Sequence, residues 1–185
     1  MNNALKKIES ERIILDPMSE VYVTRDYLKW LNDSEVIKYL EINSTTEFND
    51  LKLYVNDKIK NKSLFWAIVI KNNNKHIGNI KLEPISLYHQ TATLGIMLGS
   101  KDEWGKGYAK EAINILIRYS FNHLNLRKIN LGVVESNINA LKLYEKLGFK
   151  IEGKQTNQGY YNHKLDNVIL MGLFKEDYDL RDYSS

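Results

Sequence analysis

The spacing of apolar residues predicts strands over much of the chain. Residues 64–70 read LFWAIVI, and residues 76–85 and 91–99 follow as two further β-rich runs joined by short polar links. Three consecutive strands with short links predict an antiparallel meander. Further strands are predicted at residues 12–18, 128–134, 149–153 and 166–174.

Helical spacing dominates between these runs. Helices are predicted at residues 24–32, 33–41, 47–60, 107–124 and 139–147. Thr24 and Asp33 stand where N-caps are expected, and Gly148 where a left-handed C-terminal cap is expected. The helix after residue 107 presents one wide apolar face, made of Ala109, Ala112, Ile113, Leu116, Ile117, Ser120, Phe121 and Leu124.

This order of elements, with helices first, a meander next and a β-α-β-α-β run last, predicts an α/β domain with a mixed sheet. A length of 185 residues favours a single domain over residues 1–185, with a core over about 10–175 and a short polar tail after it. No apolar run approaches ~20 residues, and the N-terminus lacks a signal-peptide core, so we expect a cytoplasmic protein without a membrane span.

The amino-acid composition limits which nucleophiles, metal sites and partners are expected. The chain has no Cys, which excludes thiolate nucleophiles and Cys-ligated zinc, and its four His are scattered, so no metal site is expected. The net charge is only +3, and the basic stretches are typical of solvated surfaces, so no nucleic-acid partner is expected.

Two glycines precede the longest predicted helix, in the stretch WGKGYAKEA (residues 104–112). A helix N-terminus has backbone N–H groups without partners, and glycine lets an anion approach them. Gly105 and Gly107 therefore suit a phosphate cradle, with Lys106 and Lys110 adding positive charge. The same glycines also suit a tight turn before an ordinary helix, and this stretch alone leaves both interpretations open.

A second stretch, NINALKLYEKLGF (residues 137–149), favours the phosphate cradle over the ordinary turn. Together with WGKGYAKEA it resembles the GCN5-related N-acetyltransferase (GNAT) family, and the opening ERIILDPMS resembles that family's RimJ/RimL-type branch. The resemblance implies an α/β (α+β) GNAT fold. Its mixed, mostly antiparallel sheet of about six to seven strands is flanked by helices and splayed between the two central parallel strands.

The resemblance also implies acetyl-CoA as the acetyl donor. The residues implied in its binding are Met97, Leu98 and Gly99 for the pantetheine arm, Trp104, Gly105, Lys106, Gly107, Tyr108, Ala109 and Lys110 in the pyrophosphate loop, and Asn137, Asn139 and Lys142 on the following helix. Trp104 departs from the common Gln or Arg, and we favour a packing role that holds the loop. Asn137 suits both a cofactor contact and an N-cap.

The resemblance implies that the acetyl group passes directly from acetyl-CoA to an amine. Tyr144 matches the family's Tyr near the cofactor sulfur, where a neutral phenol can protonate the departing thiolate. The alternative role for Tyr144 is that of an aromatic residue packed in the core. Glu83 is the first candidate for the base, and the others are Glu41, His89 and Asp166. A route through water without a single base is also open.

The predicted acceptor is the amine of a small molecule, with a nucleotide-linked amino sugar as the leading candidate. Trp30, Glu41 and Tyr160 are candidates for binding it, although core packing would also explain the aromatic residues. A protein N-terminal acetyltransferase of the ribosomal type and a non-catalytic acetyl-CoA sensor are the alternatives. A homodimer is compatible with exposed sheet edges.

Overall fold

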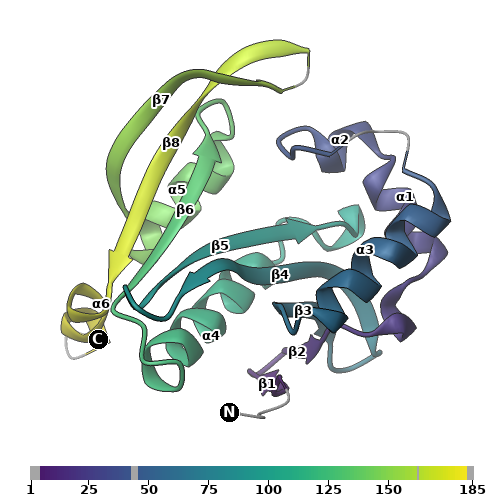
Figure 1. Cartoon of the computed structure of the whole chain (residues 1–185), viewed down its shortest axis with the longest axis horizontal. Helices are drawn as coiled ribbons and strands as arrows, with labels where there is room; N and C mark the ends of the chain where they lie inside the picture. Colours follow the sequence, from purple (N-terminus) through teal and green to yellow (C-terminus); the bar gives the residue numbers. More distant parts are fainter. Residues whose placement is uncertain (1–4, 43–45, 162, 183–185) are drawn as a thin grey trace. The chain divides into compact units, whose positions relative to one another are not determined.

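The computed structural model describes residues 5–42, 46–161 and 163–182. The elements in chain order are β1 (Ile8–Glu9), β2 (Ile13–Pro17), the 3-10 turn η1 (Glu20–Tyr22), α1 (Arg25–Leu31), α2 (Ser34–Ile37), α3 (Phe48–Lys60), β3 (Leu64–Ile70), β4 (Lys75–Ser86), β5 (Thr91–Leu98), η2 (Lys101–Glu103), α4 (Tyr108–Asn122), β6 (Lys128–Val134), α5 (Ile138–Leu147), β7 (Lys150–Tyr161), β8 (Lys164–Phe174) and α6 (Lys175–Asp182) (Figure 1). Among the described residues, no helix is long and apolar enough to cross a membrane.

The chain folds into two compact units. Residues 1–83 and 95–115 form the first, and residues 84–94 and 116–185 form the second. The strand order of the sheet is β1-β2-β3-β4-β5-β6-β8-β7. Strands β4 and β5 and helix α4 each contribute residues to both units.

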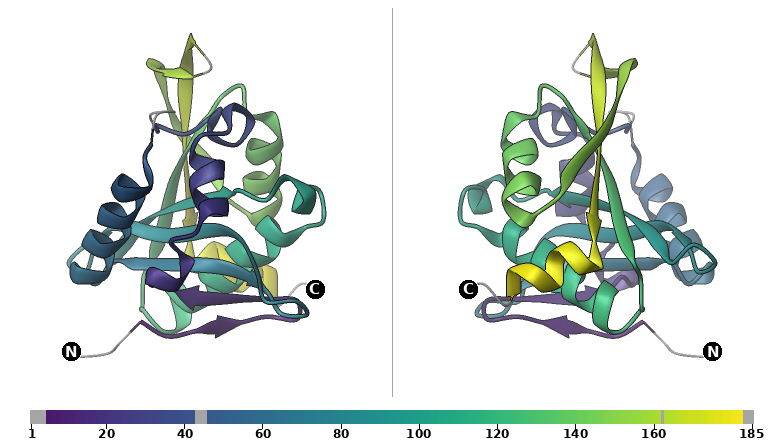
Figure 2. Two further views of the ribbon diagram at one scale, coloured as in Figure 1. Left: turned by 90° about the vertical axis from the view of Figure 1, so that its right-hand side faces the viewer. Right: turned by 90° about the vertical axis from the view of Figure 1, so that its left-hand side faces the viewer.

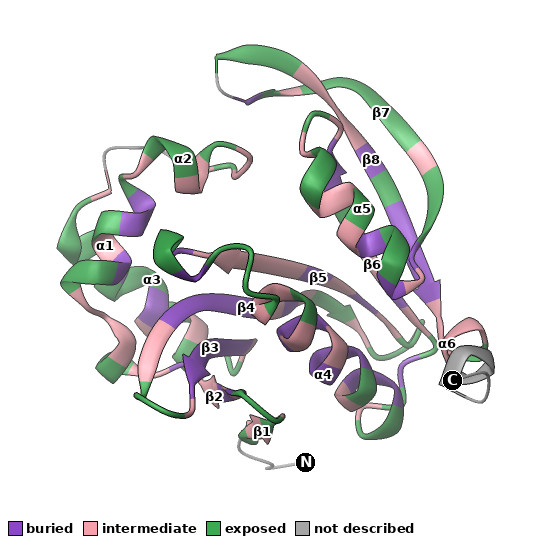
Figure 3. Ribbon diagram, turned by 180° about the vertical axis from the view of Figure 1, so that it is seen from behind, coloured by how far each residue is buried: buried purple, intermediate pink, exposed green. Residues whose placement is uncertain are grey.

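In the first unit, α1 and α3 pack on one face of the β3–β4 ladder (Figures 2 and 3). Strand β3 pairs antiparallel with both β2 and β4, and residues 65–70 are buried. The apolar core on this face consists of Met18, Tyr27, Trp30, Leu31, Leu51, Val55, Phe65, Ala67 and Val69. Burial of this apolar cluster stabilises the packing of α1 and α3 on the sheet.

The helix starts of this unit follow the predicted caps. Thr24 Oγ1 accepts a hydrogen bond from Tyr27 N at 3.1 Å, and Asp33 Oδ1 accepts one from Glu35 N at 3.0 Å. These side chains satisfy N–H groups that the helices leave without partners. Both predicted N-caps are confirmed.

The second unit contains the only parallel strand pair among the described residues. Strand β5 pairs with β6 at Thr91–Lys128, Ala92–Ile129 and Thr93–Asn130. Strand β8 lies antiparallel between β6 and β7. The mixed, mostly antiparallel sheet confirms the predicted fold class.

The structure differs from the sequence prediction at four places. The helix predicted at residues 33–41 is only four residues long and ends at Ile37. The sheet has eight strands rather than six to seven, because the two-residue β1 pairs with β2. Strand β7 extends over Lys150–Tyr161 rather than 149–153, although most of it is polar and exposed, because the ladder to β8 supplies its backbone partners. The predicted polar tail begins as helix α6, which Tyr178 anchors by packing against Phe121 with ring centroids 5.5 Å apart.

Candidate active site

The loop before α4 takes a conformation that only glycine adopts at low cost. Gly105 has φ +75° and Gly107 has φ +84°. Gly107 is the residue from which α4 starts, since its carbonyl accepts from Glu111 N at 3.1 Å. An added Cβ at Gly105 would meet nothing within 4 Å. The backbone is therefore open to a ligand at a helix N-terminus, which suits the pyrophosphate of acetyl-CoA.

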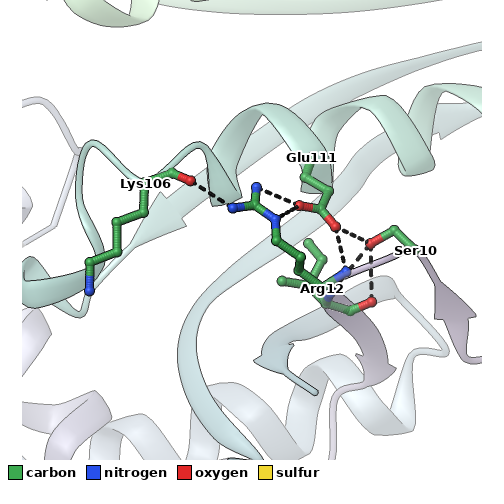
Figure 4. Close-up of polar contacts among 5 residues, drawn as sticks. Ser10, Arg12, Lys106 and Glu111 are labelled. Carbon is green, nitrogen blue, oxygen red and sulfur yellow. Dashed lines mark hydrogen bonds and ion pairs between the residues drawn. The ribbon is translucent and has the colours of Figure 1, made fainter. Parts of the chain in front are cut away.

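A polar network holds this loop and the first turn of α4 (Figure 4). The Arg12 guanidinium donates to Lys106 O at 3.0 Å and to Glu111 Oε2 at 2.7 Å. Glu111 Oε1 accepts from Ser10 Oγ at 2.7 Å and from Arg12 N at 2.9 Å. Arg12 also lies over the Tyr108 ring, 4.7 Å from its centroid. The start of the chain thus fixes a loop about a hundred residues away in sequence.

Trp104 holds the loop through a hydrogen bond rather than through packing, since the residue is 41% exposed. Its indole Nε1 donates to Leu98 O at 2.8 Å, so it ties the glycine loop to the last residue of β5. Gly99 N donates to Ile77 O at 2.9 Å. Of the three residues predicted for the pantetheine arm, Gly99 therefore has its N–H engaged within the sheet.

The two lysines of the loop differ in their surroundings. Lys106 Nζ lies 2.9 Å from Glu103 Oε2, and Glu103 also pairs with Lys75 at 2.8 Å. Hydrogen bonds from Lys75 and Lys106 lower the pKa of Glu103, so its charge offsets part of the local positive charge. Lys110 is exposed in the first turn of α4.

In the second unit, helix α5 and its N-cap contain two residues that the sequence predicted for the site. Asn137 Oδ1 accepts from Ala140 N at 3.3 Å, so the predicted N-cap is confirmed. Tyr144 is 8% exposed, and burial raises its pKa to about 12, which keeps the phenol protonated at neutral pH. Asn139 and Lys142 are exposed on the same helix.

The first unit contains a cavity of about 570 Å³ between α1, α3 and the sheet. Its walls include Gly95, Ile96 and Met97 of β5, and Met97 is the first of the three residues predicted to bind the pantetheine arm. The polar and aromatic residues of the lining are Tyr27, Glu41, Thr46, Asp50, Tyr54, Phe65, Asn79 and Lys81. Two carboxylates and one ammonium group therefore line the cavity.

The three residues predicted to bind the acceptor have different surroundings in the structure. Glu41 lines the cavity. Trp30 is 9% exposed and belongs to the core, where an added Cβ on Gly99 would lie 2.1 Å from its ring. Tyr160 lies on β7 in the second unit and is 76% exposed.

Glu83, the first candidate for the base, forms an ion-pair cluster. Lys58 Nζ lies 2.6 Å from Glu83 Oε2, and Lys81 Nζ lies 3.4 Å from the same atom. Burial by itself would raise the pKa of Glu83, but the two lysines outweigh it and lower the pKa. A carboxylate held in this way is a weak proton acceptor, so the geometry favours a structural role.

The other candidate bases lie in the second unit or in the cavity wall. His89 is exposed on the link between β4 and β5, and its carbonyl accepts from Arg127 Nε at 2.9 Å. Hydrogen bonding with Ser136 lowers the pKa of Asp166. Within the described residues, no group of three His, Cys, Asp or Glu is arranged to hold a metal ion.

Sequence reasoning missed Arg12, Asn79 and Lys81. Arg12 gives no signal because its partner Glu111 is 99 residues away. Asn79 and Lys81 alternate on one strand, and this period of two could have marked them as neighbours on one face.

The sequence model described as acetyltransferase (GNAT) domain matches residues 12–150, about three quarters of the chain. The chain belongs to the GNAT family. This GNAT protein is 29% identical over 178 residues to the uncharacterized N-acetyltransferase p20 of Bacillus licheniformis, covering 94% of this chain and 99% of that protein. It is also 29% identical over 147 residues to the spermidine N(1)-acetyltransferase of Vibrio cholerae, covering 80% and 84%.

Comparison with solved structures agrees with the sequence relatives. A crystal structure of the spermidine N-acetyltransferase of Vibrio cholerae, in complex with CoA and spermine, matches this GNAT protein with a TM-score of 0.81 and 27% identity. The match covers 90% of this chain and 97% of that one. The predicted family, activity and donor are therefore confirmed: the protein is an acetyl-CoA-dependent N-acetyltransferase.

Proposed function

We propose that this enzyme acetylates the primary amine of a small molecule that binds in the cavity of the first unit. The observation that carries the proposal is the position of the cavity wall at Gly95–Met97, which continues into the segment that the family resemblance assigns to acetyl-CoA. A volume of about 570 Å³ lies within the usual range for small-molecule sites, roughly 300–1,000 Å³.

The charges of the lining support a cationic acceptor. Glu41 and Asp50 attract an ammonium group, and Tyr27, Tyr54 and Phe65 supply aromatic surface beside it. Lys81 opposes a second ammonium group in the same cavity. Amino sugars, including nucleotide-linked ones, carry one amine and several oxygens, and they remain our leading candidate.

The spermidine N(1)-acetyltransferases among the relatives give the second candidate, a polyamine. Two carboxylates in the lining are compatible with it. A protein N-terminus is the third, and short peptides test it in the same assay.

We assign the acid role to Tyr144. In the transfer, the amine nitrogen forms a bond to the acetyl carbon and gives up one proton to water, the carbon–sulfur bond breaks, and the departing thiolate takes a proton from Tyr144, whose phenolate water then reprotonates. The burial of Tyr144 on α5 supports this assignment, because the phenol is neutral at physiological pH and has a proton to donate; the raised pKa makes it a weaker acid than a free tyrosine. No cysteine is present to carry the acetyl group, so transfer is direct.

A thiol-release assay with acetyl-CoA tests the function. The panel contains nucleotide-linked and free amino sugars, polyamines, aminoglycosides and short N-terminal peptides, and acetyl-CoA binding is measured separately by calorimetry. Release with one class of small amine supports the proposal. Release with peptides alone contradicts it, and so does donor binding without release from any amine.

A further inference from the structure

The register of β3 and β4 places Lys81 on the side of the sheet that carries the cavity. Phe65 pairs with Lys81 across the antiparallel ladder, and residues directly opposite each other point to the same face. Phe65 packs in the core under α1 and α3 and lines the cavity together with Lys81. The side chain of Lys81 is 36% exposed, so a ligand can reach it.

Gly95 on β5 makes room for this side chain. A Cβ added to Gly95 would lie 3.3 Å from Cε of Lys81 and 3.4 Å from its Cγ, so the aliphatic stem of Lys81 lies across the glycine. Gly95 itself lines the cavity. Lysine side chains packed in this way bury the stem and keep the charged end in water. The ammonium group, which is bonded to Cε, therefore stands at the cavity wall beside Gly95.

The neighbouring carboxylate compensates only part of this charge. Glu83 accepts from Lys58 Nζ through both of its oxygens, at 2.7 and 2.6 Å, whereas Lys81 Nζ lies 3.4 Å from Glu83 Oε2. That distance is long for a charge-assisted hydrogen bond, which is usually about 2.7–2.9 Å. Two lysines thus share one carboxylate. The excess positive charge lies at Lys81, because its side chain is 36% exposed and that of Lys58 is 17% exposed.

The negative charges of the cavity lining stand on other elements. Asp50 on α3 and Glu41 after α2 line the cavity together with Lys81. Asp50 Oδ2 accepts from Glu47 N at 3.0 Å in the capping box of α3, which holds this carboxylate in the first turn of the helix. The lining therefore offers carboxylates to an ammonium group and an ammonium group to an anion. A ligand that carries only one kind of charge satisfies only one of them.

We propose that Lys81 binds an acidic group of the acceptor, so that the substrates are amines that also carry a carboxylate or a phosphate. The oxygens of the acidic group accept from the ammonium group of Lys81 in a charge-assisted contact. An unsubstituted polyamine supplies no such acceptor, and its second ammonium group is repelled by Lys81. The inference rests on the proposed function and narrows its substrate class.

Matched amines test the inference. The first set is 5-aminopentanoate, 5-aminopentan-1-ol and 1,5-diaminopentane, which differ in the charge of one end, and the second set is glucosamine 6-phosphate and glucosamine. We expect the native enzyme to favour the acidic member of at least one set by roughly tenfold or more in kcat/KM, because the analogues leave Lys81 without an acceptor. The set that shows the preference distinguishes carboxylate from phosphate. Calorimetric binding of the same compounds gives a readout that does not depend on turnover.

Variants assign the preference to this residue. Lys81→Met removes the charge and keeps an unbranched stem over Gly95, so it should bring the ratio of acidic to neutral amine to within about threefold of one. The affinity for acetyl-CoA should stay unchanged. Lys81→Glu should reverse the preference towards the diamine. Lys52→Met, which removes the same charge from an exposed position on α3, is the matched control and should leave the ratios as they are.

Glu83→Gln should change the preference in the opposite direction. The substitution removes the negative charge that Lys58 and Lys81 share, so the ratio of acidic to neutral amine should rise by about threefold or more. A purely structural role of Lys81 would not produce this rise. A ratio that falls in Glu83→Gln would contradict the inference.

The outcomes separate the two proposals. Equal binding and turnover of the acidic and neutral members of both sets by the native enzyme would overturn the inference while leaving the proposed function intact. A preference for the acidic member that survives in Lys81→Met would also overturn it. Selective binding of the acidic amines without acetylation of any amine would instead count against the proposed function.

Discussion

Helices α4 and α5 start in opposite ways. Helix α4 starts from Gly107, which has no side chain and has φ +84°. Helix α5 starts from Asn137, whose Oδ1 accepts from the N–H of Ala140. The first start offers backbone to a ligand, whereas the second uses its own side chain to satisfy the helix.

The difference indicates what each helix contributes. Helix α4 contributes a helix N-terminus that suits an anion, and Arg12 and Trp104 hold its loop in place. Helix α5 contributes a buried phenol, Tyr144, from its body. We therefore expect changes at α4 to alter donor affinity and changes at Tyr144 to alter turnover.

The largest effect is expected from Tyr144→Phe. The substitution removes the hydroxyl and keeps the ring, so kcat should fall by about 10² or more, the range of general acid catalysis. The dissociation constant of acetyl-CoA should change little, as measured by calorimetry. Because burial raises the Tyr144 pKa to about 12, its ionisation should not lower the native rate at any pH below ~11. An unchanged kcat in the variant would remove Tyr144 from the mechanism.

Gly107→Val should weaken acetyl-CoA binding more than it slows turnover. Its Cβ would lie 3.4 Å from Arg12 Nη2, and the left-handed backbone conformation would cost ~1–3 kcal/mol. The dissociation constant of acetyl-CoA should rise by roughly tenfold or more, with a smaller change in kcat at saturating donor. Gly148→Val is the control, since Gly148 has φ +98° at the C-terminal cap of α5 and shares the strain. If both variants weaken acetyl-CoA equally, strain rather than a phosphate cradle explains the effect.

Removing the support of the α4 loop should have an intermediate effect. Glu111→Gln weakens the charge-assisted contacts to Ser10 and Arg12 and should lower the free energy of unfolding by ~1–2 kcal/mol, since Arg12 is partly exposed. Burial opposes ionisation of Glu111, but hydrogen bonds from Ser10 and Arg12 outweigh it and lower its pKa below the ordinary 4.5. This contribution is therefore present above pH 4.5 and is lost as the pH falls through the folded-state pKa.

Thermal denaturation across pH checks that prediction. The native protein and Glu111→Gln should differ most above pH 4.5 and converge in acid. Glu145→Gln, an exposed change on α5, should follow the native curve. A constant difference at every pH would mean that packing, rather than charge, is what Glu111 supplies.

The smallest effect is expected at Asn137. Asn137→Ala removes the cap of α5 and should lower the free energy of unfolding by ~1 kcal/mol in denaturant titrations. Asn137→Ser keeps a capping oxygen and should restore most of that stability. If Asn137→Ser nevertheless weakens acetyl-CoA binding, Asn137 also contacts the donor, as the family resemblance implies. Unaltered affinity in both variants would restrict Asn137 to the cap.

The local signals in the sequence were sufficient for most of the helices and strands and for the helix caps. Caps at Thr24, Asp33 and Asn137 and the left-handed Gly148 depend on neighbours within a few residues, so they could be predicted from spacing. The polar strand β7 and helix α6 could not, because the β8 ladder and the contact between Tyr178 and Phe121 stabilise them.

By itself, the sequence determined the α/β class with its mixed sheet and the caps of helices α1, α2 and α5, because these depend on residue type and short spacing. The acetyl donor followed from the resemblance to the GNAT family, which the comparisons confirm. Only the tertiary structure decided that Glu83 is held by two lysines, that Trp30 belongs to the core and that Glu41 lines a cavity. Such properties arise from contacts between segments that are distant along the chain, and local spacing does not record them.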